Sequence, residues 1–146
     1  MKWNCEPLAV WLRFWPVENH SLGGNAVIKA IKFVSVPVAD QKRALEFYTQ
    51  KLGFTIVTDQ EFDSKQRWIE LGIPGAATGV VLFTPDEHRD RIGTFSAISF
   101  NCDNCERTYE ELKGRGVEFD GAPQKMPWGT FAKFRDSEGN LFVMSS

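Results

Sequence analysis

The clearest cluster of residues able to do chemistry in this sequence is Cys102-Asp103-Asn104-Cys105. Two cysteines at this spacing can form a redox pair or supply half of a zinc site, and a cysteine near a helix N-terminus can have a lowered pKa. The alternative is structural, with Cys102 facing a helix-packed core and Cys105 beginning a helix. There is no second pair at this spacing and the surrounding strand pattern is not thioredoxin-like, so the structural interpretation is favoured.

Charged residues on two predicted strands are the next candidates. Glu70 shares a strand face with Trp68. If that face lines a cleft, Glu70 is a carboxylate in apolar surroundings with a raised pKa and a possible role as a base, and otherwise it is a rim residue in water. Lys133 and Arg135 share one face of a later strand, where they hold an anionic ligand group or form a solvated edge.

The elements that must position these residues are clearest between residues 30 and 54. Two alternating sets of side chains in the first part predict a strand with two different faces: Val34, Val36 and Val38 against Phe33, Ser35 and Pro37. Asp40 then suits the N-cap of a helix. The apolar stripe of that helix comprises Ala44, Leu45, Phe47, Tyr48 and Leu52. Gly53 suits the position of positive φ after the helix, and a second strand begins at Phe54.

The second part of the chain repeats this plan. Asp40 and Asn104 lie 64 positions apart, as do Phe33 and Ala97. The pattern predicts a βαβββ unit over residues 29–84, a charged connector over 85–93 that forms a solvated face, and a second βαβββ unit over 94–146. Each unit is too small to be stable alone, so the two are expected to share one core.

These residues also carry a resemblance to a known family. Val38-Ala39-Asp40, Phe47-Tyr48, Leu52-Gly53-Phe54 and the turn Asp136-Ser137-Glu138-Gly139-Asn140 resemble the vicinal oxygen chelate superfamily, which contains glyoxalases, bleomycin resistance proteins and extradiol dioxygenases. The resemblance covers residues 29–146. It implies an α+β fold of two βαβββ modules that form a curved mixed sheet with helices on the convex face, and a homodimer with a cleft near its interface.

In metal-dependent members of that family, His, Gln and Glu ligands project from four strands onto the concave face. The resemblance places these ligands at Phe33, Leu82, Ala97 and Val143 in this chain, and none of these side chains can bind a divalent ion. The only histidines, His20 and His88, lie outside both modules, and no Ser-His-Asp or Cys-His arrangement can be assembled from them. No metal and no other cofactor is expected.

The concave face is therefore predicted to form an apolar cleft with a few polar groups, as small-molecule sites usually do. The residues expected to line it are Phe33, Ser35, Trp68, Ala97, Ser99, Asn101, Trp128 and Val143. The leading hypothesis is a metal-independent protein that binds an aromatic or amphipathic small molecule, as drug-sequestering relatives do. The alternatives are an enzyme of the glyoxalase or dioxygenase type and a structural relative whose pocket is filled by Phe33.

Composition excludes other classes of function. The net charge is −2 and no basic run is present, which argues against nucleic-acid binding. No apolar stretch is long enough to cross a membrane. The odd number of cysteines, three, does not indicate a disulfide framework and suggests a cytoplasmic location. Residues 1–28 lie outside the resemblance and are interpreted as an extension, either accessory or serving as a lid or dimer contact.

Overall fold

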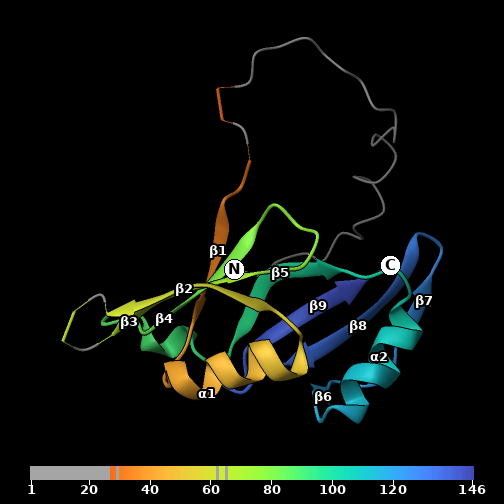
Figure 1. Cartoon of the computed structure of the whole chain (residues 1–146). Helices are drawn as coiled ribbons and strands as arrows, with labels where there is room; N and C mark the ends of the chain where they lie inside the picture. The colour runs from red at the N-terminus through yellow and green to blue at the C-terminus, as the bar shows by residue number, and fades with distance from the viewer. Residues whose placement is uncertain (1–26, 29, 62, 65) are drawn as a thin grey trace, which may run out of the picture.

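A computed structural model of the protein describes residues 27–28, 30–61, 63–64 and 66–146, and Figure 1 shows the arrangement of its elements. The first half comprises β1 (Phe33–Pro37), α1 (Gln41–Glu46), the π-helical turn η3 (Phe47–Lys51), β2 (Thr55–Glu61), β3 (Arg67–Gly72) and β4 (Gly79–Phe83). After the short 3-10 turn η4 (Arg89–Arg91), the second half comprises β5 (Phe95–Asn101), α2 (Cys105–Gly114), β6 (Glu118–Phe119), β7 (Gln124–Met126), β8 (Gly129–Arg135) and β9 (Leu141–Ser145). The predicted duplication and the α+β class are confirmed.

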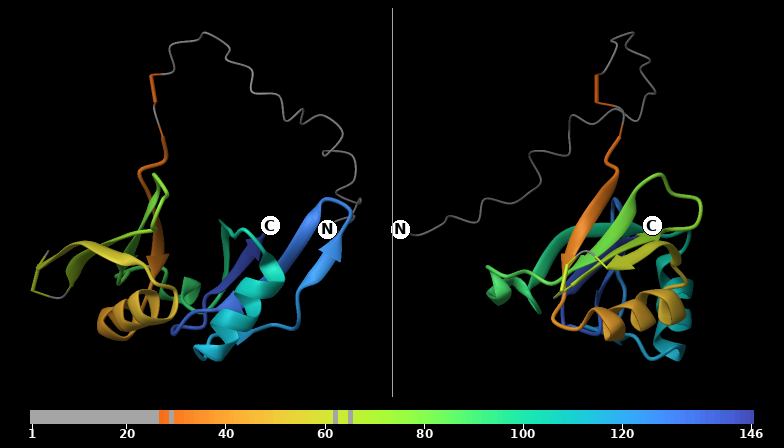
Figure 2. Two further views of the ribbon diagram at one scale, coloured as in Figure 1. Left: turned by 45° about the vertical axis from the view of Figure 1, so that its right-hand side comes forward. Right: turned by 60° about the vertical axis from the view of Figure 1, so that its left-hand side comes forward.

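Each half builds its own mixed sheet. The first sheet has the order β1-β4-β3-β2, and the second has the order β5-β9-β8-β6, with β7 paired to β8. In both sheets the first strand pairs in parallel with the last one, and the remaining pairs are antiparallel. The predicted curved sheet is thus two sheets of matching topology. In Figures 1 and 2, α1 lies at the lower end of the molecule and α2 rises beside the second sheet.

One hydrophobic core joins the two halves. Val36 of β1 and Val38, which directly follows the strand, are fully buried, whereas Ser35, which precedes Val36, is exposed. The helical stripe packs on the same side, where Tyr48 is fully buried and belongs to the same cluster of side chains as Phe142 of β9. Because neither sheet covers its own apolar face, the shared core holds the halves together, as the small size of each unit required.

The predicted helix boundaries are also confirmed. The Asp40 carboxylate accepts a hydrogen bond of 3.0 Å from the Arg43 amide, and Asn104 accepts one of 2.8 Å from the Arg107 amide. Each cap satisfies a backbone donor that the first helical turn leaves free. Gly53 has φ of 76°, a conformation that glycine adopts without a steric penalty. Among the described residues, no helix has the length and apolar composition that a bilayer span requires.

Candidate functional site

Two neighbouring hollows lie on the face opposite the helices. The larger, about 350 Å³ and called the connector hollow, is bounded by β1, β4, β5 and the segment between the halves; six of its lining residues are Ser35, Phe83, His88, Arg91, Phe95 and Ala97. The smaller, about 260 Å³ and called the tryptophan hollow, is lined by Ser35, Gln66, Arg67, Trp68, Val81 and Phe83. Because Ser35 and Phe83 line both, the two hollows meet at these residues.

Three of the eight predicted cleft residues line these hollows. Ser35 lines both, Trp68 the smaller and Ala97 the larger. Phe33 lies beside them, because its ring meets the Trp68 ring edge to face with a centroid separation of 5.6 Å. The alternation of β1 and β5 predicted in the sequence therefore places Ser35 and Ala97 on the open face.

The other four predicted cleft residues lie outside the linings of both hollows. Ser99 and Asn101 are exposed on β5, and Val143 is the β9 partner of Ser99. Trp128 is 67% exposed in the turn between β7 and β8, where Met126 pairs with Gly129. Trp68 and Trp128 thus do not line a common hollow, although both were expected to line the predicted cleft.

The expected position of one metal ligand was wrong. Leu82 was placed on the concave face, but it is fully buried in the core with Val36, its partner on β1. The open face of β4 carries Val81 and Phe83, which line the tryptophan hollow. Neither of these has a metal donor atom either, and no group of three or more His, Cys, Asp or Glu side chains suited to a metal occurs among the described residues. The strand positions that correspond to the ligands of metal-dependent relatives therefore carry no side-chain donor atom for a metal.

The connector contributes three ionisable side chains to the larger hollow, which the sequence did not predict. Residues 85–93 were expected to form a solvated face, and Glu87, His88 and Arg91 are indeed exposed, but they also line the larger hollow together with Phe95. The one sequence signal was the concentration of ionisable groups in this segment. Their direction could not be predicted, because strand alternation says nothing about a loop.

The connector is held in place by backbone hydrogen bonds. The Arg91 amide donates to the His88 carbonyl at 3.0 Å, and the Leu141 amide donates to the Thr94 carbonyl at 2.9 Å. His88 has φ of 61° and ψ of 36°, and it is the one non-glycine residue with positive φ in the described part of the chain. A side chain in this left-handed region is strained, so the surrounding contacts must impose its conformation.

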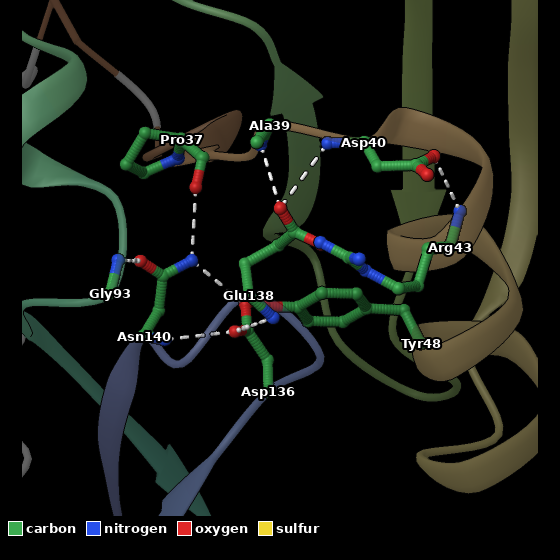
Figure 3. Close-up of polar contacts among 9 residues, drawn as sticks. All are labelled: Pro37, Ala39, Asp40, Arg43, Tyr48, Gly93, Asp136, Glu138 and Asn140. Carbon is green, nitrogen blue, oxygen red and sulfur yellow. Dashed lines mark hydrogen bonds and ion pairs between the residues drawn. The ribbon is translucent and has the colours of Figure 1, made fainter.

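A buried polar clasp, formed by Asp136, Glu138 and Asn140, connects both halves and the connector (Figure 3). The Asn140 amide nitrogen donates to the Pro37 carbonyl and to the Asp136 carboxylate, both at 2.9 Å, and its oxygen accepts from the Gly93 amide at 2.8 Å. Asn140 also lines the connector hollow. One side chain therefore fixes the end of β1, the connector and the turn before β9 around the hollow.

The carboxylates of the clasp bind both the start of α1 and the turn η3 that follows it. The Tyr48 hydroxyl donates to Asp136 at 2.8 Å. The Glu138 side chain, which is 1% exposed, pairs with Arg43 at 2.6 Å and accepts from the Ala39 amide at 2.8 Å. Burial raises the pKa of the Asp136 carboxyl, although hydrogen bonds from Asn140 and Tyr48 act in the opposite direction. Burial and the Asp136 charge raise the pKa of Tyr48 well above its usual value. The turn that suggested the family therefore has a structural role here.

The cysteine pair and Arg135 have structural partners. Cys102 and Cys105 are free thiols whose sulfurs approach the carbonyls of Ser145 and Met144 at 3.4 and 3.9 Å. Burial raises the pKa of the Cys105 thiol to about 11, which disfavours the reactive thiolate and favours the structural interpretation of this pair. Arg135 donates to both oxygens of Asp120 at 3.0 and 2.9 Å.

Comparison with known proteins agrees with this geometry. The family model described as the Glyoxalase/Bleomycin resistance protein/Dioxygenase superfamily matches residues 30–144. The chain is 38% identical over 118 residues to the uncharacterized protein YetH of Bacillus subtilis, covering 81% of this chain and 98% of the relative.

Solved structures give the same result. A member of that superfamily from Sphaerobacter thermophilus has a TM-score of 0.75 and 33% identity, covering 82% of this chain and 98% of the other. TnmS3, an antibiotic binding protein from Streptomyces sp. CB03234, has a TM-score of 0.73 and 31% identity, covering 82% of this chain and 97% of the other.

Proposed function

Because the chain belongs to the glyoxalase/bleomycin resistance protein/dioxygenase superfamily, we propose that it is a metal-independent binding protein for small aromatic or amphipathic molecules. The observation that carries the proposal is the pair of adjacent hollows with aromatic walls. Phe83 lies between them, Phe95 borders one and Trp68 the other, and the Ser35 hydroxyl is available to both. Such a site gains affinity from burial and stacking and orients its ligand with few polar groups.

Two further observations support binding over the alternatives. The Phe33 ring packs against Trp68, and the hollows beside it are open, which argues against a structural relative whose pocket Phe33 fills. Phe33, Ala97 and Val143 stand at three of the expected ligand positions, and none of these side chains can hold a catalytic metal. The same is true of Val81 and Phe83, which face the hollow where Leu82 was expected to do so. TnmS3, which resembles this chain over most of its length, is described as an antibiotic binding protein. Sequestration of a drug-like molecule is therefore the specific form of the proposal, and a homodimer in the cytoplasm is part of it.

A fluorescence titration of the full chain with planar antibiotics and aromatic acids tests this function. We expect saturable quenching that is largely lost in Trp68→Phe and retained in Trp128→Phe, because of these two residues Trp68 lines a hollow and Trp128 does not. If no compound changes the emission or raises the melting temperature, the binding function is refuted.

A further inference from the structure

Three ionisable side chains of the connector converge on the larger hollow without a structural role of their own. Glu87, His88 and Arg91 all line it. Within the described residues, the side chains of these three make no hydrogen bond or ion pair. Arg91 differs in this respect from four other arginines, each of which is paired with a carboxylate: Arg43, Arg67, Arg115 and Arg135. A guanidinium at the wall of an aromatic hollow is thus available to a ligand.

The backbone that carries Arg91 is held before any ligand arrives. The Thr94 hydroxyl donates to the Arg91 carbonyl at 2.7 Å. The Gly93 amide donates to the buried Asn140 side chain at 2.8 Å. His88 keeps its left-handed conformation at the start of the same turn. A site fixed in this way loses less conformational entropy when it binds, which favours affinity.

We propose that the connector hollow selects aromatic carboxylates, with the ring against Phe83 and Phe95 and the carboxylate paired with the Arg91 guanidinium. The inference rests on the proposed binding function and names its ligand class. The planar fork of arginine matches a carboxylate through two parallel hydrogen bonds, and such charge-assisted pairs are stronger than neutral ones. The volume of about 350 Å³ is within the range of small-molecule sites.

Glu87 should weaken the binding of an anionic ligand, whereas Arg91 strengthens it. It lines the same hollow, so its carboxylate opposes a bound anion and disfavours ligands with a second negative group. Removal of this charge should strengthen the binding of a monocarboxylate by about two- to fivefold, the scale of an exposed charge interaction. If substitution of Glu87 strengthens the binding of a monocarboxylate and substitution of Arg91 weakens it, a general loss of structure cannot explain both results.

Calorimetry with two matched probes, 2-naphthoate and the neutral 2-naphthamide, tests the proposal on the full chain. The wild type should bind 2-naphthoate about tenfold or more tightly than 2-naphthamide. Arg91→Gln should remove this preference, and Glu87→Gln should increase it. Arg89→Gln is the control, because Arg89 belongs to the same turn and is exposed, but does not line the hollow; it should leave both affinities unchanged.

The possible failures are distinguishable. If both probes bind equally and Arg91→Gln changes neither affinity, the carboxylate selectivity is wrong while the binding function stands. If Arg89→Gln weakens 2-naphthoate as much as Arg91→Gln does, the effect is one of net charge and the assignment to Arg91 is overturned. If neither probe nor any planar antibiotic binds, both proposals fail. Unchanged melting temperatures of the variants would establish that folding is preserved.

Discussion

Replacing Asn140 by alanine should destabilise the whole protein, although Asn140 lies at the end of a turn. Its side chain joins three segments that are distant in sequence: Pro37 at the end of β1, Gly93 in the connector and Asp136 before the last strand. Asn140 is 2% exposed, so water cannot replace these partners after the substitution. The Pro37 carbonyl, the Gly93 amide and one Asp136 oxygen would each lose a hydrogen bond.

The expected size follows from these three contacts. A hydrogen bond between neutral groups contributes about 1 kcal/mol and one to a charged group about 1.5 to 3 kcal/mol. Asn140→Ala should therefore lower the free energy of unfolding by about 3 to 5 kcal/mol. For a chain of this size, that loss corresponds to a fall in the melting temperature of roughly 6 to 20 °C.

Thermal and urea unfolding, followed by circular dichroism, would measure this loss. Asn140→Asp separates hydrogen bonding from volume, because it keeps the shape and replaces the amide donor by an acceptor that faces the Pro37 carbonyl and the Asp136 carboxylate. It should be at least as destabilising as Asn140→Ala. Asn101→Ala is the control, because Asn101 is exposed on β5, and it should change the stability by less than about 0.5 kcal/mol.

A loss below about 1 kcal/mol for Asn140→Ala would refute the assignment of the clasp as the link between the halves. A harmless Asn140→Asp would do so even more directly, because the substitution reverses the polarity of the contact with Pro37.

Three further predictions concern other parts of the chain. Phe47→Ala should cost about 3 to 5 kcal/mol of stability in chemical denaturation, because Phe47 is buried in the core, and it should leave ligand affinity unchanged; a stable variant that binds poorly would mean that the helix contributes to the site. A chain shortened to begin at Val27 should remain soluble and melt within a few degrees of the full chain, and a large loss would show that the first 26 residues pack onto the core. Cys105 should resist alkylation by iodoacetamide at pH 8 in the native protein, and rapid modification would contradict its burial. Because the folded pKa of Cys105 is raised to about 11, its protonated thiol stabilises the fold fully below the pKa of the unfolded thiol, and this contribution is lost as the pH rises toward 11.

Much of the fold could be predicted from alternation and capping. The buried Val36 and Val38, the exposed Ser35 that precedes them, and the Asp40 cap follow from local rules that tertiary contacts do not override. The open faces of β1 and β5 were therefore identified correctly, and with them Ser35 and Ala97 of the hollows.

The errors occurred where the sequence has no alternation. Residues 80–83 are apolar at every position, so nothing in the pattern shows that Leu82 is buried and that Val81 and Phe83 face the hollow. The helix caps are 64 positions apart, whereas Trp68 and Trp128 are 60 apart, so the two tryptophans are not equivalent positions of the two halves. Trp128 instead lies in the turn between β7 and β8. These features depend on pairing between distant residues.

The position of the connector is the clearest case of this dependence. It is fixed by a hydrogen bond between the Gly93 amide and the side chain of Asn140, 47 residues further along the chain. Local propensity carries no information about such a contact. The sequence therefore predicts the exposure of the charged connector residues, but not that three of them line the larger hollow.

The most direct test of the central claim fills the junction of the two hollows. Ser35 lines both hollows and is exposed, so Ser35→Phe should occupy the site without disturbing the core. Ser99, 64 positions later, is the equivalent exposed residue of β5 outside both linings, which makes Ser99→Phe the matched control. In calorimetry of protein dialysed against EDTA, we predict that Ser35→Phe weakens both naphthyl probes by about tenfold or more, while Ser99→Phe binds them like the wild type. Equal affinities in all three proteins, or binding that requires a metal ion, would contradict the account.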